Sequence, residues 1–471
     1  MPDAAADVRA LLHRVADEAG DWFAALPDRP VGPERGQEDL ALAATLPEHP
    51  TAAHDVIADL VAEASPGLPA MGSPRYFGFV VGGAQPAGVA ADWLVSAWDQ
   101  NTGLVALTPG LTAVEAIAGR WILDVLRLPA EASFAFVTGC QMAHVTALAA
   151  ARHRVLSDAG HDVERDGLAG APPIRVLAGG ERHVTVDRAL RFLGIGSAAL
   201  VPLAVDERGA MRADALRAAL DDGDGRPTIV AAQVGNVNTG AIDPMAEICD
   251  AARAAGAWVH VDGAFGLWAA ASPTHRHLVA GVEQADSWAT DAHKWLNVPY
   301  DSGIAVVRDA SAHRAAMSVT AAYLVQPQDG AREPLDWTPE FSRRARGVPV
   351  YATLRALGRS GVADLVDRLC ACAARFAERL PEVEGFAVLA HEVNQVLVRV
   401  DDDAVTAATL AGVQADGTCW PTGTTWRGGT CIRLSVSNWQ TTPEDVDRSI
   451  DALARAAREA RAHAAAPEVG V

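Results

Sequence analysis

The chain has 471 residues, of which 59 are Asp or Glu and 39 are Lys or Arg, so its formal net charge is −20. This acidic balance offers no general surface for nucleic acid or for an anionic membrane, and we expect neither as a partner. Half of the residues are hydrophobic and 21% are charged, as is ordinary for a globular protein with a sizeable core. Of the 39 basic residues, Lys294 alone is a lysine.

Arginine can replace lysine in ion pairs and phosphate contacts, but not where the chemistry needs an amine. A guanidinium stays protonated and forms no Schiff base. The alternative explanation is codon bias with one chance survivor, which the Ala- and Arg-rich composition supports. The neighbours of Lys294 decide between the two explanations.

Residues 1–72 are expected to form an N-terminal helical arm. Apolar residues have helical spacing from about Asp7 to Leu26, and two Pro-rich stretches follow. Asp3, Asp7 and Arg9 interrupt the apolar core that a signal peptide needs. No apolar run approaches the ~18 residues of a membrane helix. We therefore expect a cytoplasmic protein.

Six scattered cysteines, without a Cys-x-x-Cys pair, support neither a disulfide scaffold nor a structural zinc site, and no metal is expected.

Residues 73–339 alternate between short apolar runs and longer helical runs. This alternation predicts an α/β fold with a mostly parallel central sheet, covered by helices on both faces. Residues 340–471 are expected to form a small α+β C-terminal domain, in which a long helical region to about Leu380 precedes further strands. The strands expected in the two domains are 133–138, 174–179, 227–235, 257–262, 285–291, 395–400 and 430–438.

Lys294 follows the predicted strand 285–291, and therefore lies at the edge of the sheet where ligands of open α/β proteins bind. Asp262 ends the preceding strand, and the small residues Gly263 and Ala264 after it leave room for a flat ligand. An amine to hold an aldehyde and an acid to keep a pyridine nitrogen protonated are both needed by a pyridoxal phosphate site. The alternative for Asp262 is an ordinary cap or turn residue.

The turn after strand 133–138 could bind a phosphate. The amides of Gly139, Cys140 and Gln141 open a helix, and a helix N-terminus attracts anions. The alternative is an ordinary helix cap by Thr138. His183 follows a strand and two glycines, where its ring could lie flat on a cofactor, although it could equally be one exposed histidine among 14.

The order of these features resembles the pyridoxal-phosphate-dependent amino acid decarboxylases of the glutamate and aromatic-L-amino-acid group, which have fold type I. The features are the turn Thr138–Met142, His183, Asp262 with its small neighbours, and His293-Lys294-Trp295. The resemblance runs from about Ser73 to the C-terminus. Its most specific parts are VHVDGAFG and ATDAHKWLNVPYD.

The resemblance implies that Lys294 forms a Schiff base with pyridoxal 5'-phosphate, that Asp262 pairs with the pyridine nitrogen and that His183 stacks on the ring. Tyr323 stands 29 residues after Lys294, where the family carries a mobile-loop tyrosine. In the family, that tyrosine is associated with protonating the carbanion left when carbon dioxide departs. A structural tyrosine that packs the loop is the alternative.

The resemblance also implies that His293 and the turn Thr138–Cys140 approach the phosphate, and that Ala264 packs beneath the ring. The phosphate loop departs from the family, because it reads TGCQMAH where a Ser-rich turn followed by Asn or Thr is common. Asp291 replaces an asparagine of the aromatic-amino-acid members. A carboxylate repels a phosphate, so Asp291 is expected either to point away or to cap a helix or turn.

Substrate recognition is expected from Phe79, Val80 and Arg433. Phe79 keeps an aromatic group in a segment that lines the substrate pocket of the aromatic members, whereas Val80 and its neighbours replace bulkier or polar groups. Arg433 could bind a carboxylate or could face solvent from its strand.

The resemblance therefore implies decarboxylation of an L-amino acid, aromatic or otherwise hydrophobic, to its amine. By analogy with the family, we expect a homodimer with two-fold symmetry. Two alternatives remain open. One is another pyridoxal phosphate reaction, such as aldehyde synthesis, carbon–carbon lyase chemistry or transamination, and the other is a non-catalytic protein of the same fold.

Overall fold

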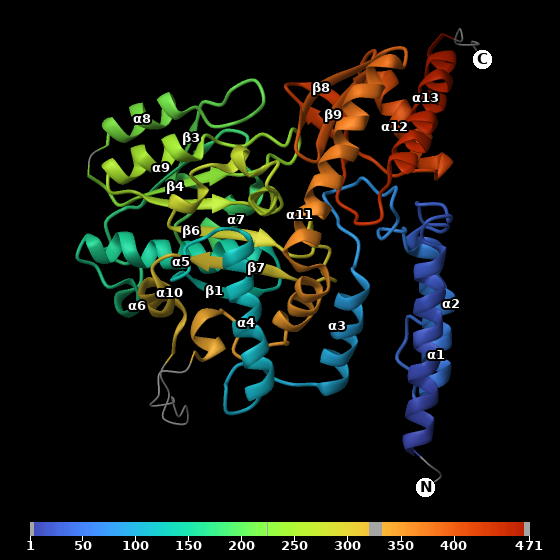
Figure 1. Ribbon diagram of the computed structural model, residues 1–471, viewed down its shortest axis with the longest axis horizontal. Coiled ribbons are helices and arrows are strands. Elements are labelled where there is room, and N and C mark those ends of the chain that lie inside the picture. The colour runs from blue at the N-terminus through green and yellow to red at the C-terminus, as the bar shows by residue number, and fades with distance from the viewer. Residues whose placement is uncertain (1–3, 224, 320–331, 466–471) are drawn as a thin grey trace.

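A seven-stranded sheet lies at the centre of the computed structural model, which describes residues 4–223, 225–319 and 332–465 (Figure 1). The strand order is β1-β7-β6-β5-β4-β2-β3, and only β7 runs antiparallel to its neighbours. The predicted mostly parallel sheet is therefore confirmed. The strands are β1 (Ser133–Val137), β2 (Arg175–Gly179), β3 (Leu200–Leu203), β4 (Thr228–Gln233), β5 (Trp258–Asp262), β6 (Ser287–Asp291) and β7 (Gly303–Val307).

Helices cover both faces of this sheet, which explains why its strands are continuous apolar runs. In β4, Ile229 and Ala231 pack towards α5 and α7, whereas Val230 and Ala232 pack on the opposite face with α8 and α9. The helices of this region are α3 (Pro86–Trp98), α4 (Pro109–Val125), α5 (Cys140–Asp158), α6 (Val163–Asp166), α7 (Val184–Phe192), α8 (Ala213–Asp221), α9 (Met245–Ala254) and α10 (Ala310–Met317).

The carboxyl ends of β1, β4, β5 and β6 meet at one edge of the sheet, because these strands run in the same direction. Asp262 and Asp291 are the last residues of β5 and β6 at this edge. The antiparallel β7 begins there with Gly303, and a Cβ at Gly303 would lie 2.4 Å from Gly139. The absence of a side chain thus lets β7 approach the turn before α5.

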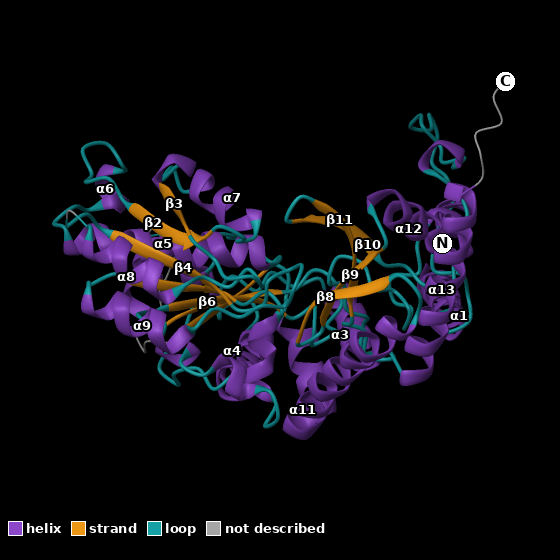
Figure 2. Cartoon of the chain, turned by 90° about the horizontal axis from the view of Figure 1, so that it is seen from above, coloured by secondary structure: helices purple, strands orange, loops and turns teal. Residues whose placement is uncertain are grey.

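The C-terminal region contains a four-stranded antiparallel sheet in the order β10-β11-β9-β8. Its strands pack with helices, as expected for a small α+β region (Figure 2). Gly358, with φ of 64°, interrupts α11. The elements are α11 (Gly347–Arg379), β8 (Phe386–Glu392), β9 (Gln395–Val400), α12 (Asp403–Asp416), β10 (Thr422–Trp426), β11 (Gly429–Ser435) and α13 (Pro443–Ala465). The domain limits at 72/73 and 339/340 remain predictions.

Two N-terminal helices, α1 (Ala4–Ala25) and α2 (Ala53–Ala64), stand at the edge of the molecule, away from the large sheet (Figure 1). The chain that follows them is anchored on the C-terminal region, where Tyr76 forms a β-bridge with Trp420 and the Arg75 Nε donates to the Thr418 carbonyl at 2.7 Å. This anchor leads directly into the segment that carries Phe79. None of the helices within the described ranges is both long and apolar enough to cross a membrane.

Candidate active site

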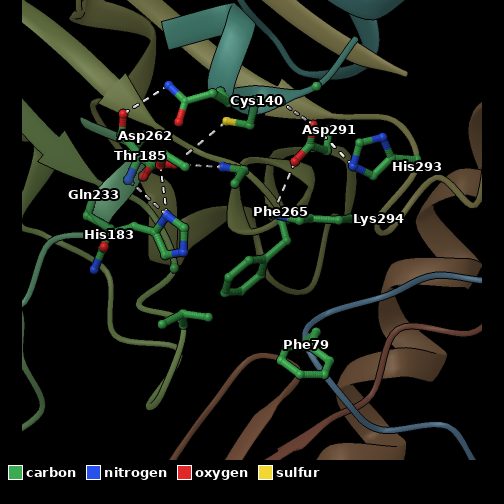
Figure 3. A pocket seen from close by; sticks show the side chains of 15 residues that line it. Phe79, Cys140, His183, Thr185, Gln233, Asp262, Phe265, Asp291, His293 and Lys294 are labelled. Carbon is green, nitrogen blue, oxygen red and sulfur yellow. Dashed lines mark hydrogen bonds and ion pairs between the residues drawn. The ribbon is translucent and has the colours of Figure 1, made fainter. Parts of the chain in front are cut away.

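A cavity of about 290 Å³ lies at the carboxyl edge of the large sheet (Figure 3). It brings together every residue predicted to bind the cofactor except Thr138. The lining residues are Phe79, Gly139, Cys140, Gln141, His183, Thr185, Gln233, Gly235, Val237, Asp262, Ala264, Phe265, Asp291, His293 and Lys294.

Lys294 lies in the loop after β6, and its Nζ is 3.1 Å from Asp291 Oδ2. Burial disfavours the ammonium form, but the Asp291 carboxylate, with further contributions from Cys140 and Asp262, leaves the pKa of Lys294 raised. Only a neutral amine attacks an aldehyde, so the ion pair with Asp291 holds Lys294 in its less reactive form.

Asp291 turns its carboxylate into the cavity. Its Oδ1 accepts a hydrogen bond of 2.6 Å from the amide of Cys140, the first residue of α5, and lies 3.4 Å from the Nε2 of His293. The expectation that Asp291 points away is therefore wrong, and the expectation that it caps a helix is confirmed. The carboxylate holds a helix N-terminus that would otherwise attract an external anion.

Asp262 is buried at the end of β5, and its Oδ1 accepts the Ala264 amide at 3.2 Å. Its Oδ2 lies 3.6 Å from the Nε2 of His144, on the first turns of α5. Burial alone would raise the pKa of Asp262, but His144, His183 and Lys294 together hold it below its ordinary value. The carboxylate is therefore ionised. It faces the cavity while it accepts the hydrogen bond from the Ala264 amide.

His183 is the N-cap of α7, rather than an exposed histidine. Its Nδ1 is 2.7 Å from the Thr185 hydroxyl, and the Thr185 amide donates to the same nitrogen at 3.4 Å. Burial lowers the pKa of His183. The cap fixes the imidazole in the cavity wall, on the same side as Asp262 and Gln233 (Figure 3).

The turn between β1 and α5 has no side-chain cap of its own. Gly139 is the N-cap of α5, so the alternative of a cap by Thr138 is wrong. The Gln141 Nε2 donates to the Thr185 carbonyl at 3.2 Å, while its Oε1 is buried and has no hydrogen-bond partner among the described residues. Because buried acceptors are normally satisfied, this orphaned oxygen fits a ligand that brings a donor into the cavity.

His293 lies across the same turn. Its Nδ1 accepts the Ser302 amide at 3.0 Å, and its ring stacks on Tyr300 with the ring centroids 4.2 Å apart. These contacts leave the Nε2 as the protonated nitrogen, which faces Asp291. Burial lowers the pKa of His293.

Phe79 and Val80 both have positive φ, 55° and 59°, in a region that favours glycine. Phe79 lines the cavity and is 64% exposed, whereas Val80 is 1% exposed in the hydrophobic core. The structure thus brings Phe79 to the site but not Val80. A Cβ at Gly82 would lie 2.2 Å from the Lys294 carbonyl oxygen, so this segment packs directly against the lysine loop.

Arg433 is buried in β11, so the expectation of a solvent-facing residue is wrong. Its Nη1 donates to the Val237 carbonyl at 3.2 Å, and its Nη2 lies 3.5 Å from the Thr422 hydroxyl. Burial lowers the pKa of Arg433. The guanidinium therefore sits behind Val237, not on the cavity surface itself.

Tyr323 lies outside the described residues, so its predicted role stays a prediction.

The sequence analysis did not identify Gln233, which ends β4 and pairs with Asp262 in the ladder between β4 and β5. The rule that selected Asp262, a polar residue at the end of an apolar strand, could have found it. Thr185, Val237 and Phe265 gave no comparable signal.

Comparison with known proteins decides the family. Residues 34–400 match the family model described as "Pyridoxal-dependent decarboxylase conserved domain", which is more than half of the chain. The chain belongs to the pyridoxal-dependent decarboxylases. This membership agrees with the cavity, which places an amine, a carboxylate, a histidine and a helix N-terminus around one space.

This decarboxylase is 32% identical over 399 residues to the L-2,4-diaminobutyrate decarboxylase of Rhizobium meliloti (strain 1021), over 82% of this chain and 78% of that protein. It is 31% identical over 410 residues to the tyrosine decarboxylase of Oryza sativa subsp. japonica, over 82% of this chain and 74% of that protein. The crystal structure of Oryza sativa TDC with PLP and tryptamine has a TM-score of 0.90 at 24% identity. The match covers 98% of this chain and 99% of that chain, so the two proteins share the fold. The enzyme is a pyridoxal-phosphate-dependent carboxy-lyase with fold type I.

Replacing Asp291 by Asn removes a charge and keeps the shape of the side chain. We expect Asp291→Asn apo-protein to bind pyridoxal 5'-phosphate at least about tenfold more tightly, since ~1.4 kcal/mol of repulsion is modest for charges in a buried site. Pyridoxal lacks the phosphate, so it gains only from the release of Lys294 from its ion pair, and its affinity should rise by less than that of pyridoxal 5'-phosphate. Equilibrium titration of the apo-proteins measures both affinities.

The matched control is Asp286→Asn, because Asp286 also accepts a strand amide, that of Val259 at 2.7 Å, but does not line the cavity. Its affinity for pyridoxal 5'-phosphate should equal that of the wild type. Equal or weaker affinity in Asp291→Asn would contradict the repulsion that we assign to this carboxylate.

Proposed function

We propose that this decarboxylase converts an L-amino acid with an aromatic or otherwise hydrophobic side chain to its amine, with Lys294 as the amine that holds the cofactor. One observation carries the proposal. The only lysine of the chain lies in a buried cavity that also contains the carboxylates of Asp262 and Asp291. An amine in this position is required by the chemistry, whereas arginine serves the rest of the protein.

The residues of the cavity fit pyridoxal 5'-phosphate. Lys294 would hold the aldehyde, Asp262 the pyridine nitrogen, and His293 with the turn at Gly139 and Cys140 the phosphate. When bound, the cofactor supplies an electron sink for the pair left by departing carbon dioxide. The Asp291 carboxylate would repel the phosphate. It would have to break its hydrogen bond with the Cys140 amide before the phosphate could accept from that amide.

The protein side chains would orient and protect the reacting group. The cap at Thr185 fixes the plane of the His183 ring, which would lie against one face of the cofactor. Ala264 would pack against the other face, since its small side chain leaves space there. Asp262, held ionised by its surroundings, would keep the ring nitrogen protonated.

The apolar part of the cavity supports a hydrophobic substrate. Phe79, Val237 and Phe265 line it, and Phe79 lies across the cavity from Asp262 (Figure 3). The substrate carboxylate would be attracted by Arg433, whose buried guanidinium has no carboxylate partner within the described ranges. The tyrosine decarboxylase of Oryza sativa is a relative that acts on an aromatic amino acid.

Tyr323 would supply the proton that completes the amine. We expect the wild type, assayed with a panel of amino acids, to release carbon dioxide and amine in equal amounts from an aromatic or hydrophobic substrate. Tyr323→Phe should release carbon dioxide but shift the product towards aldehyde and ammonia, with dioxygen consumed as the oxidant. Mass spectrometry of the products and gas analysis measure each outcome.

Tyr351→Phe is the control for the loss of a tyrosine hydroxyl, because Tyr351 stacks on Trp121 in α4, outside the cavity lining, and should keep forming amine. Unchanged amine output from Tyr323→Phe would remove Tyr323 from the mechanism. Release of carbon dioxide only from 2,4-diaminobutyrate would contradict the hydrophobic substrate class.

We further propose that the enzyme is a homodimer in which the N-terminal arm packs on the partner. Val8 and Leu12 of α1 and Val56 and Leu60 of α2 are each about half exposed, which is unfavourable for large apolar side chains on an isolated arm. An apolar groove of about 480 Å³ between α1 and α3 adds to this surface. Phe79 and Tyr300, beside the cavity, are also exposed.

If the arm packs on the partner, charged residues introduced on its exposed apolar surface should separate the subunits. Leu12→Glu with Leu60→Glu should convert the dimer to a monomer, because burying a carboxylate in an apolar interface is costly. Size-exclusion chromatography with light scattering measures the mass. Leu389→Glu, at a similarly exposed position in β8, should stay dimeric, and a monomeric wild type would contradict the proposal.

A further inference from the structure

A chain of buried polar side chains leads from the core of the large sheet to Asp262. The Trp258 Nε1 donates to the Ser287 Oγ at 2.9 Å, and the same Oγ lies 2.9 Å from the Nδ1 of His260. The Nε2 of His260 is 2.8 Å from the Nδ1 of His144, whose Nε2 faces the Asp262 Oδ2 at 3.6 Å. His260, His144 and Ser287 are completely buried.

The carboxylate at one end of this chain fixes the hydrogen bond next to it, because a carboxylate can only accept and the His144 Nε2 must therefore carry a hydrogen. The indole N–H of Trp258 donates to the Ser287 hydroxyl, which leaves the hydroxyl hydrogen free to be donated to the Nδ1 of His260. His260 then carries its hydrogen on Nε2 and donates to His144. His144 in turn carries its hydrogen on Nε2, and this N–H faces a carboxylate, which can only accept.

In this arrangement each imidazole uses one ring nitrogen as a donor and the other as an acceptor. Burial, together with the neighbouring His144, lowers the pKa of His260 to about 3, which agrees with a neutral ring. If His144 instead donated its only ring hydrogen from Nδ1 to His260, the Asp262 carboxylate would face a bare nitrogen lone pair. That arrangement is electrostatically unfavourable in a buried site.

We propose that His144 and His260 are positioning residues, which fix an N–H donor against Asp262 and so keep this carboxylate ionised and oriented towards the pyridine nitrogen of the cofactor. The inference rests on the proposed function, in which Asp262 pairs with that nitrogen. His260 itself does not line the cavity, so it would act on the cofactor only through His144 and Asp262.

The same region could be interpreted as a metal site, because Cys140, His144 and Asp262 bring their ligand atoms within 4.8 Å of one another. The hydrogen-bond chain accounts for His144 and Asp262 without an ion. The Cys140 thiol lies 3.9 Å from the Asp262 Oδ1 and 3.5 Å from the His144 Nε2, so it packs against the same pair of groups without an ion. We therefore assign these side chains to the positioning of the carboxylate.

His313 provides a matched control for His260. Each imidazole is completely buried, has its pKa lowered by burial to about 3, and places its Nδ1 within 2.9 Å of a serine hydroxyl. The Nε2 of His313, however, meets the Trp337 carbonyl at 3.0 Å instead of a chain to the cavity. Replacing either ring by phenylalanine removes two polar contacts from the core, one of them to a serine hydroxyl.

The experiment reconstitutes the enzyme with pyridoxal 5'-phosphate labelled with ¹⁵N in the ring, and records the ring-nitrogen resonance and the cofactor affinity. His260→Phe should move the resonance towards that of unprotonated pyridine and weaken affinity by about tenfold, the scale of a lost hydrogen bond to a charged group. His313→Phe should lower thermal stability with neither change. His260→Gln, whose amide can donate to His144, should restore the resonance.

An unchanged resonance in His260→Phe, or an equal shift in His313→Phe, would overturn the inference. One equivalent of metal bound in the purified holoenzyme would also overturn it. If the phenylalanine variant does not fold, Ser287→Ala with Ser133→Ala as its control carries the same test, and an unshifted resonance in Ser287→Ala contradicts the chain. Asp262→Asn separates the two proposals, because an unshifted resonance there would sink the proposed cofactor site itself.

Discussion

Two buried carboxylates at the ends of neighbouring parallel strands face the same cavity as one buried amine. Because β5 and β6 are adjacent and parallel, Asp262 and Asp291 reach the same edge of the sheet, and the loop after β6 brings Lys294 back to Asp291. Their side chains are only 7%, 3% and 20% exposed, so water screens these charges weakly. Against the opposing effect of burial, Asp291 raises the pKa of Lys294, while His144, His183 and Lys294 hold the pKa of Asp262 below its ordinary value.

Close backbone packing makes this arrangement possible. Gly82 lies against the carbonyl of Lys294, and Gly303 lies against Gly139, at distances where a Cβ could not fit. The first contact ties the segment that carries Phe79 to the lysine loop, and the second ties β7 to the phosphate turn. These contacts thus fix the position of Phe79 relative to Lys294 and of β7 relative to the phosphate turn, although the segments come from distant parts of the chain.

The strands and the central residues of the site could be predicted from sequence, because apolar runs and strand ends are local signals. The strands predicted around the site, 133–138, 257–262 and 285–291, each lie within two residues of β1, β5 and β6. Val80 could not be placed, since two consecutive residues with positive φ, Phe79 and Val80, send one side chain to the cavity and the next into the core. The contact between His144 and Asp262 depends on the packing of α5 on β5, to which no local pattern points.

Reduction of the holoenzyme with borohydride, followed by peptide mapping, tests the central role of Lys294 most directly. The account predicts that one pyridoxyl group becomes attached per chain, at Lys294, and that the visible absorbance of the cofactor is lost. The chain has no other lysine, so its assignment is unambiguous. A protein that binds the cofactor but yields no labelled Lys294 would contradict the account.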